Sequence, residues 1–299
     1  DVTPPGLPTR ERVVLVRGDG DPPAPWYDGK LVHLGDVTVA VDRLRTLVRV
    51  ADGVAGVQDD GTVVVVTPEG FQPLGQARGG SAVVASPGSP GVAWLDVDAD
   101  LAVARVPPAM VEQNLPLGAR LVARDAGATY VALRQDGYLV VDDDGTTVRR
   151  SGPVPLDVAG GTQVVATSRG LRVEGGGRTL ELVGTGAFGA RLSDDGRYLL
   201  TSEATSSSSA LAVVVDVRDG RTVRLPVPDD GRVVDAAFGG RGVLTLVLSR
   251  PEGARFPART PRGDGAQPGY DLVTCRLRVG TCETAAQLDS VPDPPLVAH

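Results

Sequence analysis

The chain has 299 residues, 41% of them hydrophobic and 22% charged, which is typical of a folded protein with a buried core and argues against extended disorder. Its formal charge of −7 argues against nucleic acids and anionic membrane surfaces as partners, because both require a basic face. Isoleucine is absent and there are 39 glycines and 24 prolines, so valine and leucine must fill the core, and strands are favoured over long helices.

The chain begins with a segment that is predicted to be a linker. Residues 1–10 are rich in proline, a composition that favours an extended segment such as one that follows a signal peptide or a membrane anchor. The first residue is Asp1, the sole methionine is Met110, and no run of 18 apolar residues is present to span a membrane. Lys30 is the only lysine, a bias typical of GC-rich bacterial genomes. We therefore expect an exported bacterial protein or an ectodomain.

Short valine- and leucine-rich runs follow one another along almost the whole chain. They are separated by Asp-Gly, Gly-Gly and Pro-Gly turns, and no stretch shows sustained helical periodicity. Asp-Gly is a favoured dipeptide of tight hairpin turns. It occurs at Asp52-Gly53, Asp60-Gly61, Asp136-Gly137, Asp144-Gly145, Asp195-Gly196, Asp219-Gly220 and Asp230-Gly231. The pattern predicts an all-β meander.

These runs form a repeat with the length of a four-stranded propeller blade. Successive units start near Leu47, Ser81, Arg120, Val154, Phe188 and Val233, at intervals of 34, 39, 34, 34 and 45 residues. Three opening runs, at 12–16, 30–34 and 36–41, provide most of a seventh unit. We predict a single propeller of four-stranded antiparallel blades over residues 11–290, followed by a C-terminal tail at 291–299. Seven blades are expected, with six as the alternative.

The two histidines do not indicate a serine hydrolase. His33 lies within a strand-like run, and His299 is the last residue. No Gly-x-Ser-x-Gly motif supplies a nucleophile, so a Ser-His-Asp triad is not expected.

Two acidic clusters are candidate cation sites. Asp96, Asp98 and Asp100 alternate like the opening of a calcium loop, but an EF-hand would require glycine where Leu101 stands. A different divalent-cation site and an exposed turn between strands both remain open. The three aspartates at 142–144 could likewise form a cation site or an exposed turn, and the glycine that follows them favours a hairpin turn.

Residues 184–189 match the dinucleotide-binding pattern Gly-x-Gly-x-x-Gly. That function requires a helix N-terminus directly after the glycines, to receive the pyrophosphate. Here a strand-like run follows and ends in a turn at 193–197. We therefore expect a loop between blades.

One unit resembles a known repeat family. The segment Leu192-Ser-Asp-Asp-Gly-Arg-Tyr-Leu-Leu200, followed by a strand at 213–222, is similar to the Ser-Pro-Asp-Gly-Lys-x-Leu signature of TolB-type and other WD-like propeller repeats. Asp194 stands where proline is usual, and the other units match in rhythm and turn chemistry alone. The resemblance implies a propeller but no particular reaction, because such propellers most often serve as binding scaffolds and also include enzymes.

Two long connections interrupt the repeat, at 204–209 and 250–270. Each replaces the turn between the second and third strands of its unit, so both should emerge on the same face of neighbouring blades. Long loops in compact domains are often functional. The longer connection carries Arg250, Arg255, Arg259 and Arg262 against Glu252 and Asp264.

These connections provide a candidate partner-binding set, comprising Arg255, Phe256, Arg259, Arg262 and Tyr270. The arginines would bind a carboxylate or phosphate, and the two aromatic rings would anchor a partner. The alternative is a solvated insertion that has no partner.

The two cysteines are expected to form a disulfide. A two-residue turn at 278–279 places Cys275 opposite Cys282 on one face of a hairpin. Such a bridge implies an oxidising compartment. The alternative is a pair of reduced, buried thiols; a metal site is not expected, because no further Cys or His lies nearby.

Together these features predict a monomeric, non-catalytic, extracytoplasmic scaffold that binds a protein or a small anionic ligand and uses no cofactor. The alternative is a propeller enzyme, a hydrolase or lyase, with carboxylates or a divalent metal in the central channel. A ring of inward-facing acidic or histidine side chains would favour the enzyme, and an apolar or merely wet channel would favour the binder.

Overall fold

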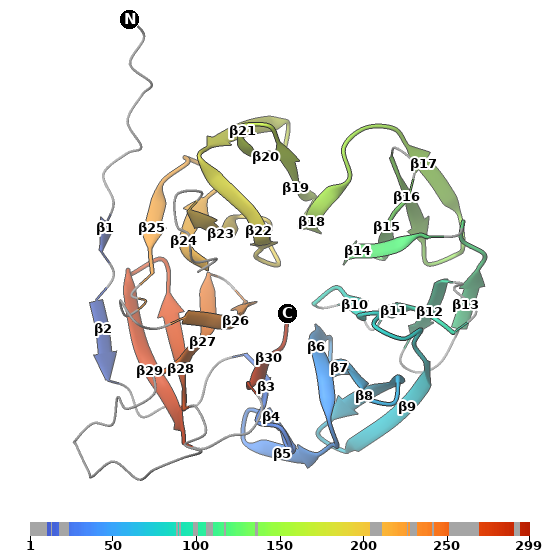
Figure 1. Cartoon of the computed structure of the whole chain (residues 1–299), viewed down its shortest axis with the longest axis horizontal. Helices are drawn as coiled ribbons and strands as arrows, with labels where there is room; N and C mark the ends of the chain where they lie inside the picture. Colours follow the sequence, from blue (N-terminus) through green and yellow to red (C-terminus); the bar gives the residue numbers. More distant parts are fainter. Residues whose placement is uncertain are drawn as a thin grey trace, which may run out of the picture.

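Seven sheets surround a central axis in the computed structural model of the chain (Figure 1). The structure describes residues 11–12, 14–17, 24–87, 89, 91–97, 101–105, 110–116, 118–134, 137–203, 211–225, 227, 232–240, 242–250, 269–289 and 294–299. Within these ranges every regular element is a β-strand. The predicted propeller is confirmed, and it has seven blades rather than six.

The strands of each blade follow one another from the ring centre outward. Blade 1 contains β30 (Leu296–Val297), β3 (Trp26–Tyr27), β4 (Leu31–Leu34) and β5 (Val37–Ala40). Blade 2 contains β6 (Leu44–Val50), β7 (Gly53–Gln58), β8 (Thr62–Thr67) and β9 (Gly70–Gln76). Blade 3 contains β10 (Val84–Ala85), β11 (Gly91–Leu95), β12 (Leu101–Arg105) and β13 (Met110–Gln113).

The remaining four blades have the same order. Blade 4 contains β14 (Arg120–Asp125), β15 (Ala128–Ala132), β16 (Tyr138–Asp142) and β17 (Thr147–Arg150). Blade 5 contains β18 (Pro155–Ala159), β19 (Thr162–Thr167), β20 (Gly170–Gly175) and β21 (Arg178–Val183). Blade 6 contains β22 (Thr185–Leu192), β23 (Tyr198–Glu203), β24 (Leu211–Asp216) and β25 (Thr222–Arg224). Blade 7 contains β26 (Arg232–Gly239), β27 (Val243–Ser249), β28 (Tyr270–Arg276) and β29 (Thr281–Leu288).

The first strands of the chain lie outside the repeat. β1 (Glu11–Arg12) pairs in parallel with β25, and β2 (Val14–Arg17) pairs in parallel with β29, so the N-terminal segment adds a fifth strand to blades 6 and 7. The run at 12–16 was predicted to belong to the seventh unit, together with those at 30–34 and 36–41. The structure corrects that assignment, because this run has a strand pattern but pairs with the outer edges of two other blades.

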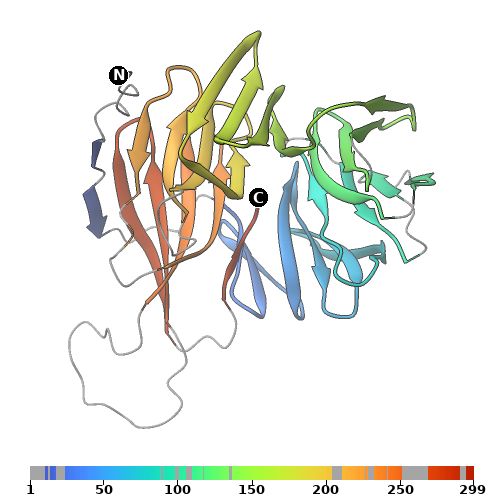
Figure 2. The same ribbon diagram turned by 45° about the horizontal axis from the view of Figure 1, so that its top comes forward.

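The ring closes through the last residues of the chain. β30 pairs with β3, and the Ala298 amide donates to the Pro25 carbonyl at 2.9 Å. The side chains of Val297 and Ala298 are fully buried. These residues belong to the segment 291–299 that was predicted to be a tail, but the chain end lies at the centre of the ring in both views (Figures 1 and 2). A two-residue strand is too short to show periodicity, so the sequence pattern does not reveal it.

Apolar clusters join adjacent blades and form the core. Six clusters of buried residues lie between neighbouring blades, and Trp94 is the largest fully buried side chain among them. Blades 4 and 5 are also linked by polar groups, because the Gly160 and Gly161 amides donate to the Asp125 carboxylate at 3.1 and 2.9 Å. This packing holds the inner strands in fixed positions around the axis.

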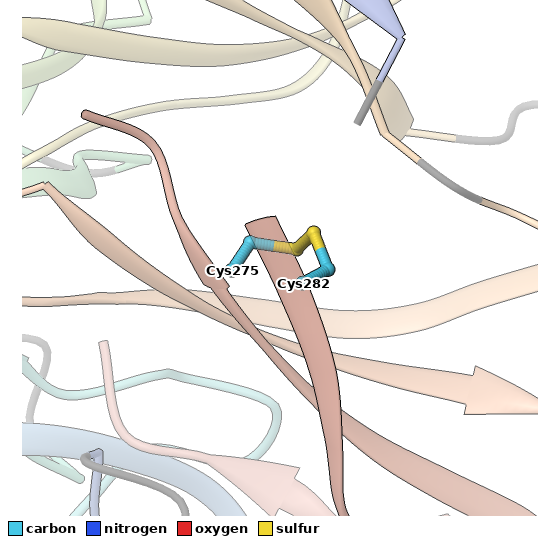
Figure 3. The surroundings of a disulfide bond; sticks show 2 residues. All are labelled: Cys275 and Cys282. Carbon is cyan, nitrogen blue, oxygen red and sulfur yellow. A yellow bond between two sulfur atoms is a disulfide. The ribbon is translucent and has the colours of Figure 1, made fainter. Parts of the chain in front are cut away.

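The predicted disulfide is present in blade 7 (Figure 3). Cys275 on β28 lies opposite Cys282 on β29 with a Cα–Cα distance of 3.9 Å, and both side chains are 1% exposed. Arg276 pairs with Thr281 in the same hairpin, which confirms the predicted register. The strand β2 adds to the edge formed by β29.

We expect alkylation of the unfolded, unreduced protein to modify neither Cys275 nor Cys282, as measured by mass spectrometry. Because the bridge closes a short loop, replacing both residues with serine should lower the free energy of unfolding by about 2–3 kcal/mol in the chain-entropy model. Alkylation of both thiols without reductant would contradict the assignment.

Candidate ligand site in the central channel

The inner strands enclose a cavity of about 710 Å³ on the axis of the ring. All seven blades contribute lining residues, and these include Thr46, Asp157, Arg191, Asp235 and His299. The volume lies within the range of small-molecule binding sites.

A repeated bulge places a side chain toward this cavity in several blades. The strands β6, β14, β18 and β26 each carry one extra residue relative to the neighbouring strand, and the residue after it is Thr46, Ala123, Asp157 or Asp235 respectively. Bulges commonly redirect side chains next to functional sites. In β22 the pairing jumps from Gly186 to Arg191, so this bulge is larger and Arg191 takes the equivalent position.

The two equivalent aspartates tie neighbouring blades together. Asp157 accepts hydrogen bonds from the amide of Val158 at 2.9 Å and from that of Leu192 in blade 6 at 2.7 Å. Asp235 likewise accepts from the amide that follows it at 2.9 Å and from that of Val297 in blade 1 at 3.0 Å. Each carboxylate therefore uses both oxygens, and one of them bridges to the next blade.

The two carboxylates nevertheless differ in pKa. Burial raises the pKa of Asp157 to about 6, although two backbone amides and the charge of Arg191 lower it. Burial alone would also raise the pKa of Asp235. His299 and the Val297 amide outweigh it and bring the pKa of Asp235 below its usual value. His299 Nε2 lies 2.9 Å from Asp235 Oδ1, and burial lowers the pKa of His299. At neutral pH we therefore assign an ionised Asp235 that accepts a hydrogen bond from the Nε2–H of a neutral His299.

An ion pair links two blades that are not neighbours. Arg49 Nη1 on β6 lies 3.1 Å from Asp194 Oδ2, which follows β22, and it donates to the Phe238 carbonyl at 2.8 Å. Burial raises the pKa of Asp194 despite this arginine. Asp194 is the residue that replaces the usual proline of the repeat signature, and its carboxylate connects blade 6 with blades 2 and 7 through Arg49.

Three polar groups that line the cavity lack a partner among the described residues. The guanidinium of Arg191 makes no hydrogen bond or ion pair there, although its charge acts on Asp157, Asp235 and His299. The atoms Thr46 Oγ1 and His299 Nδ1 are buried and have no hydrogen-bond partner. The backbone of His299 bonds to the strand that carries Thr46, because its amide donates to the carbonyl of the next residue, at position 47, at 3.2 Å.

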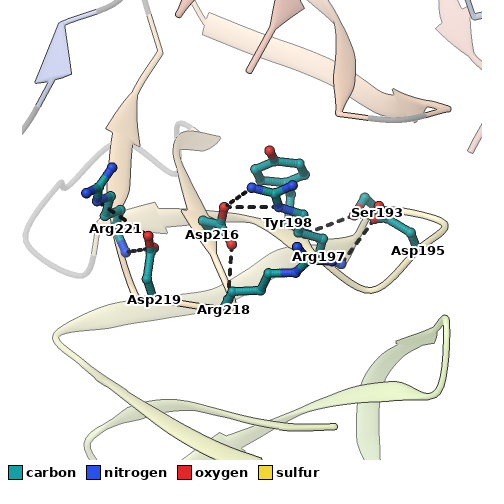
Figure 4. Close-up of polar contacts among 8 residues, drawn as sticks. All are labelled: Ser193, Asp195, Arg197, Tyr198, Asp216, Arg218, Asp219 and Arg221. Carbon is teal, nitrogen blue, oxygen red and sulfur yellow. Dashed lines mark hydrogen bonds and ion pairs between the residues drawn. The ribbon is translucent and has the colours of Figure 1, made fainter. Parts of the chain in front are cut away.

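The segment that resembles the TolB-type repeat forms a tight turn (Figure 4), and its residues Leu192 and Asp194 line the cavity. Ser193 Oγ donates to Asp195 at 2.7 Å and accepts from the Tyr198 amide at 2.9 Å. The guanidinium of Arg197 donates twice to Asp216, at 2.8 and 3.1 Å, and lies 4.9 Å from the centre of the Tyr198 ring. These contacts stabilise the β22–β23 turn and give the signature a structural role.

Most of the predicted partner-binding set lies outside the described residues. This holds for Arg255, Phe256, Arg259 and Arg262, and for the connection at 204–209. Tyr270 is 5% exposed and packs in the core between blades 7 and 1, so its prediction as a surface anchor is corrected. Strand alternation turns its ring inward, which loop composition alone does not reveal.

Arg250 fixes the base of the longer connection. Its backbone amide donates to the Gly269 carbonyl at 2.9 Å, and its guanidinium lies 3.2 Å from Asp271 and 2.6 Å from Asp289. One of the arginines of this insertion is therefore engaged in the fold.

The glycine motif does not form a dinucleotide site. Gly184 lies in a turn with a φ of 75°, Gly189 has a φ of 65°, and β22 continues to Leu192 without a helix. The predicted loop between blades is found only at Gly184, because the rest of the motif, from Thr185 on, belongs to the inner strand β22. The glycines there permit the large bulge before Arg191.

Other candidates from the sequence have structural partners. The segment 142–144 turns between β16 and β17, where Asp144 accepts from the Thr146 amide at 2.9 Å and Asp143 pairs with the buried Arg124. His33 stacks on a tryptophan ring with ring centres 3.8 Å apart, and Asp28 lies 3.1 Å from its Nε2.

Two of the three aspartates in the candidate calcium cluster, Asp98 and Asp100, lie outside the described residues. The third, Asp96, forms an isolated bridge with Ala77. Among the residues that are described, no three Asp, Glu, His or Cys side chains come together as a metal site.

Comparisons with known proteins assign no family. No family model matches this sequence, and no curated protein matches it. Similar solved structures include the propeller domain of Cps50 (Swd1) from Myceliophteria thermophila, which is 15% identical in sequence and has a TM-score of 0.49. The match covers 83% of this chain and 88% of that one. TolB from Acinetobacter baumannii has 10% identity over 84% of this chain and 65% of its own, with a TM-score of 0.45. BamB from Moraxella catarrhalis has 10% identity over 78% of this chain and 82% of its own, with a TM-score of 0.43.

Arg49, Thr46, Arg191 and the role of His299 were not predicted from the sequence. Aligning the repeat units could have revealed part of the site. The charged channel residues of blades 5 to 7, which are Asp157, Arg191 and Asp235, each follow the predicted start of their unit by two or three positions. A charged residue at the same position of successive repeats indicates a shared orientation toward the axis.

Proposed function

We propose that this chain is a non-catalytic, extracytoplasmic binding scaffold that takes a protein partner on the face bearing its two long connections. An extracytoplasmic location is supported by the buried disulfide, since such bridges persist in oxidising compartments. Among the described residues, no helix is long and apolar enough to cross a membrane.

The observation that carries the proposal is the engagement of the acidic groups in the channel. Asp125, Asp157 and Asp235 each accept a backbone amide of the next blade, and Asp194 pairs with Arg49. Paired carboxylates that act as acid and base need free oxygens aimed at a substrate. Here their oxygens hold the ring together, which favours a scaffold.

One observation favours the enzymatic alternative. Burial raises the pKa of Asp157 to about 6, and perturbed carboxyls in clefts are often catalytic. Both of its oxygens, however, accept backbone amides, at 2.9 and 2.7 Å, and one of these amides belongs to the next blade. The carboxyl group therefore has a structural role that explains its burial, so we give the scaffold precedence.

The strand order of blades 6 and 7 supports this choice of face. One connection joins β23 to β24 and the other joins β27 to β28, so both link the second and third strands of their blades. Blades 6 and 7 are adjacent and share an apolar cluster that includes Leu200 and Leu246. Equivalent connections of adjacent blades leave the ring on the same face.

Replacing Arg255, Arg259 and Arg262 together with alanine should weaken capture of the partner that the wild-type protein retains from its own cell envelope, with the greater effect at low salt. We expect each substitution to change stability by no more than about 0.5 kcal/mol, the usual range for surface positions. Mass spectrometry of proteins captured by immobilised wild type and variant is the measurement.

The matched control replaces three exposed arginines elsewhere on the ring, Arg149, Arg178 and Arg221, with alanine. This control should retain the partner. Equal capture by the wild type and the loop variant would refute the proposed face.

A further inference from the structure

We propose that the central cavity binds a small hydroxycarboxylate, with its carboxylate on Arg191 and a hydroxyl group on His299. This inference rests on the proposed binding function and names a ligand class for the channel, which is separate from the face with the long connections.

Arg191 provides the anion-binding group. Its guanidinium carries N–H donors in a planar arrangement that matches a carboxylate, yet it has no hydrogen bond or ion pair among the described residues. Asp157 and Asp235 do not meet this need, because Arg191 acts on both only through its charge and forms no ion pair with either in the described part of the chain. A carboxylate from outside the chain would supply the missing acceptors.

The repeat itself is broken where Arg191 stands. The equivalent bulges place a threonine, an alanine or an aspartate toward the channel in blades 2, 4, 5 and 7, whereas blade 6 has a larger bulge and an arginine. A side chain at position 186 would meet the Ser202 hydroxyl, and Gly189 adopts a φ of 65°, so the bulge favours glycine at both positions. The backbone of this one blade is therefore adapted to a different side chain.

His299 and Thr46 define the second half of the site. Since Nε2 of His299 donates to Asp235, Nδ1 carries the lone pair of the neutral ring and has no hydrogen-bond partner, although the Ala236 backbone also lies against the ring and raises its pKa. A ligand hydroxyl can donate to this nitrogen. Thr46 Oγ1 is buried without a partner on an inner strand and can donate or accept. A ligand with both a carboxylate and hydroxyl groups would satisfy all three side chains, and the nearby aspartates favour a single negative charge on it.

Gluconate tests this assignment, with hexanoate and sorbitol as matched comparisons. Hexanoate keeps the carboxylate without the hydroxyls, and sorbitol keeps the hydroxyls without the carboxylate. Isothermal titration calorimetry at pH 7 should show that the wild-type protein binds gluconate at least about tenfold more tightly than either comparison. No gluconate binding up to about 10 mM, or equal binding of hexanoate or sorbitol, would overturn the proposal.

Two variants assign the binding to the cavity. Arg191→Gln should weaken gluconate binding at least about tenfold, and Thr46→Val, which keeps the side-chain shape, should weaken it severalfold. The control Arg149→Gln removes an exposed arginine on the outer strand β17 and should bind like the wild type. If Arg191→Gln folds and binds gluconate as the wild type does, the site is refuted. If Arg191→Gln does not fold, unchanged binding by Thr46→Val refutes it. Partner capture by the long connections is measured separately, so either proposal can fail alone.

Discussion

Replacing Asp235 with alanine should lower the free energy of unfolding by about 3–5 kcal/mol. The substitution leaves the amides of Ala236 and Val297 and the ring N–H of His299 without their acceptor, and an unsatisfied buried donor costs about 1–3 kcal/mol. The urea midpoint at unchanged m-value measures the loss. Since these bonds hold β30 in place, amide exchange at Val297 should accelerate more than exchange in blade 4.

The control is Asp219→Ala. Asp219 lies 3.4 Å from Arg221 in an exposed pair, with side-chain exposures of 48% and 76%. Such pairs contribute about 0–1 kcal/mol, so this variant should differ little from the wild type. A similar loss in both variants would show that ring closure does not depend on Asp235.

The architecture could be predicted because it depends on local signals. The Asp-Gly turns, the runs of valine and the intervals between units each reflect a backbone preference that acts within a few residues. The predicted starts of six units lie within three residues of the starts of β6, β10, β14, β18, β22 and β26. The pairing of Cys275 with Cys282 is predictable for the same reason, since a short hairpin fixes which residues face each other.

The closure of the ring could not be predicted in this way. β30 and β3 have two residues each and come from opposite ends of the chain, so neither shows a period and their pairing is set only when the other blades are in place. The candidate site depends on the same long-range arrangement. Arg49 meets Asp194 across the ring, and His299 meets Asp235 only after closure.

The stability of the wild-type protein should fall as pH rises from about 4 to about 6, through the contribution of Asp157. Burial raises the pKa of Asp157 to about 6 in the folded chain, while the unfolded chain keeps the usual value of 3.8. Between these values the folded state binds more protons than the unfolded state, so raising the pH favours unfolding. The full effect is on the order of 3 kcal/mol, and it is complete above about pH 6.

Asp157→Asn isolates this contribution from those of other groups. Asp235 and His299 act in the opposite direction, because a lowered pKa in the folded state means that their contribution to stability is lost as the pH falls. Both remain in the variant, so the difference between the two unfolding curves, measured by urea titration from about pH 4 to about pH 7, reports Asp157 alone. We expect the wild type to lose stability relative to Asp157→Asn over the lower part of this range and to run parallel to it above about pH 6. If the stability curves of the wild type and Asp157→Asn are parallel from about pH 4 to about pH 7, Asp157 is ionised in the folded protein over this whole range. In that case its two backbone hydrogen bonds outweigh the effect of burial on its pKa.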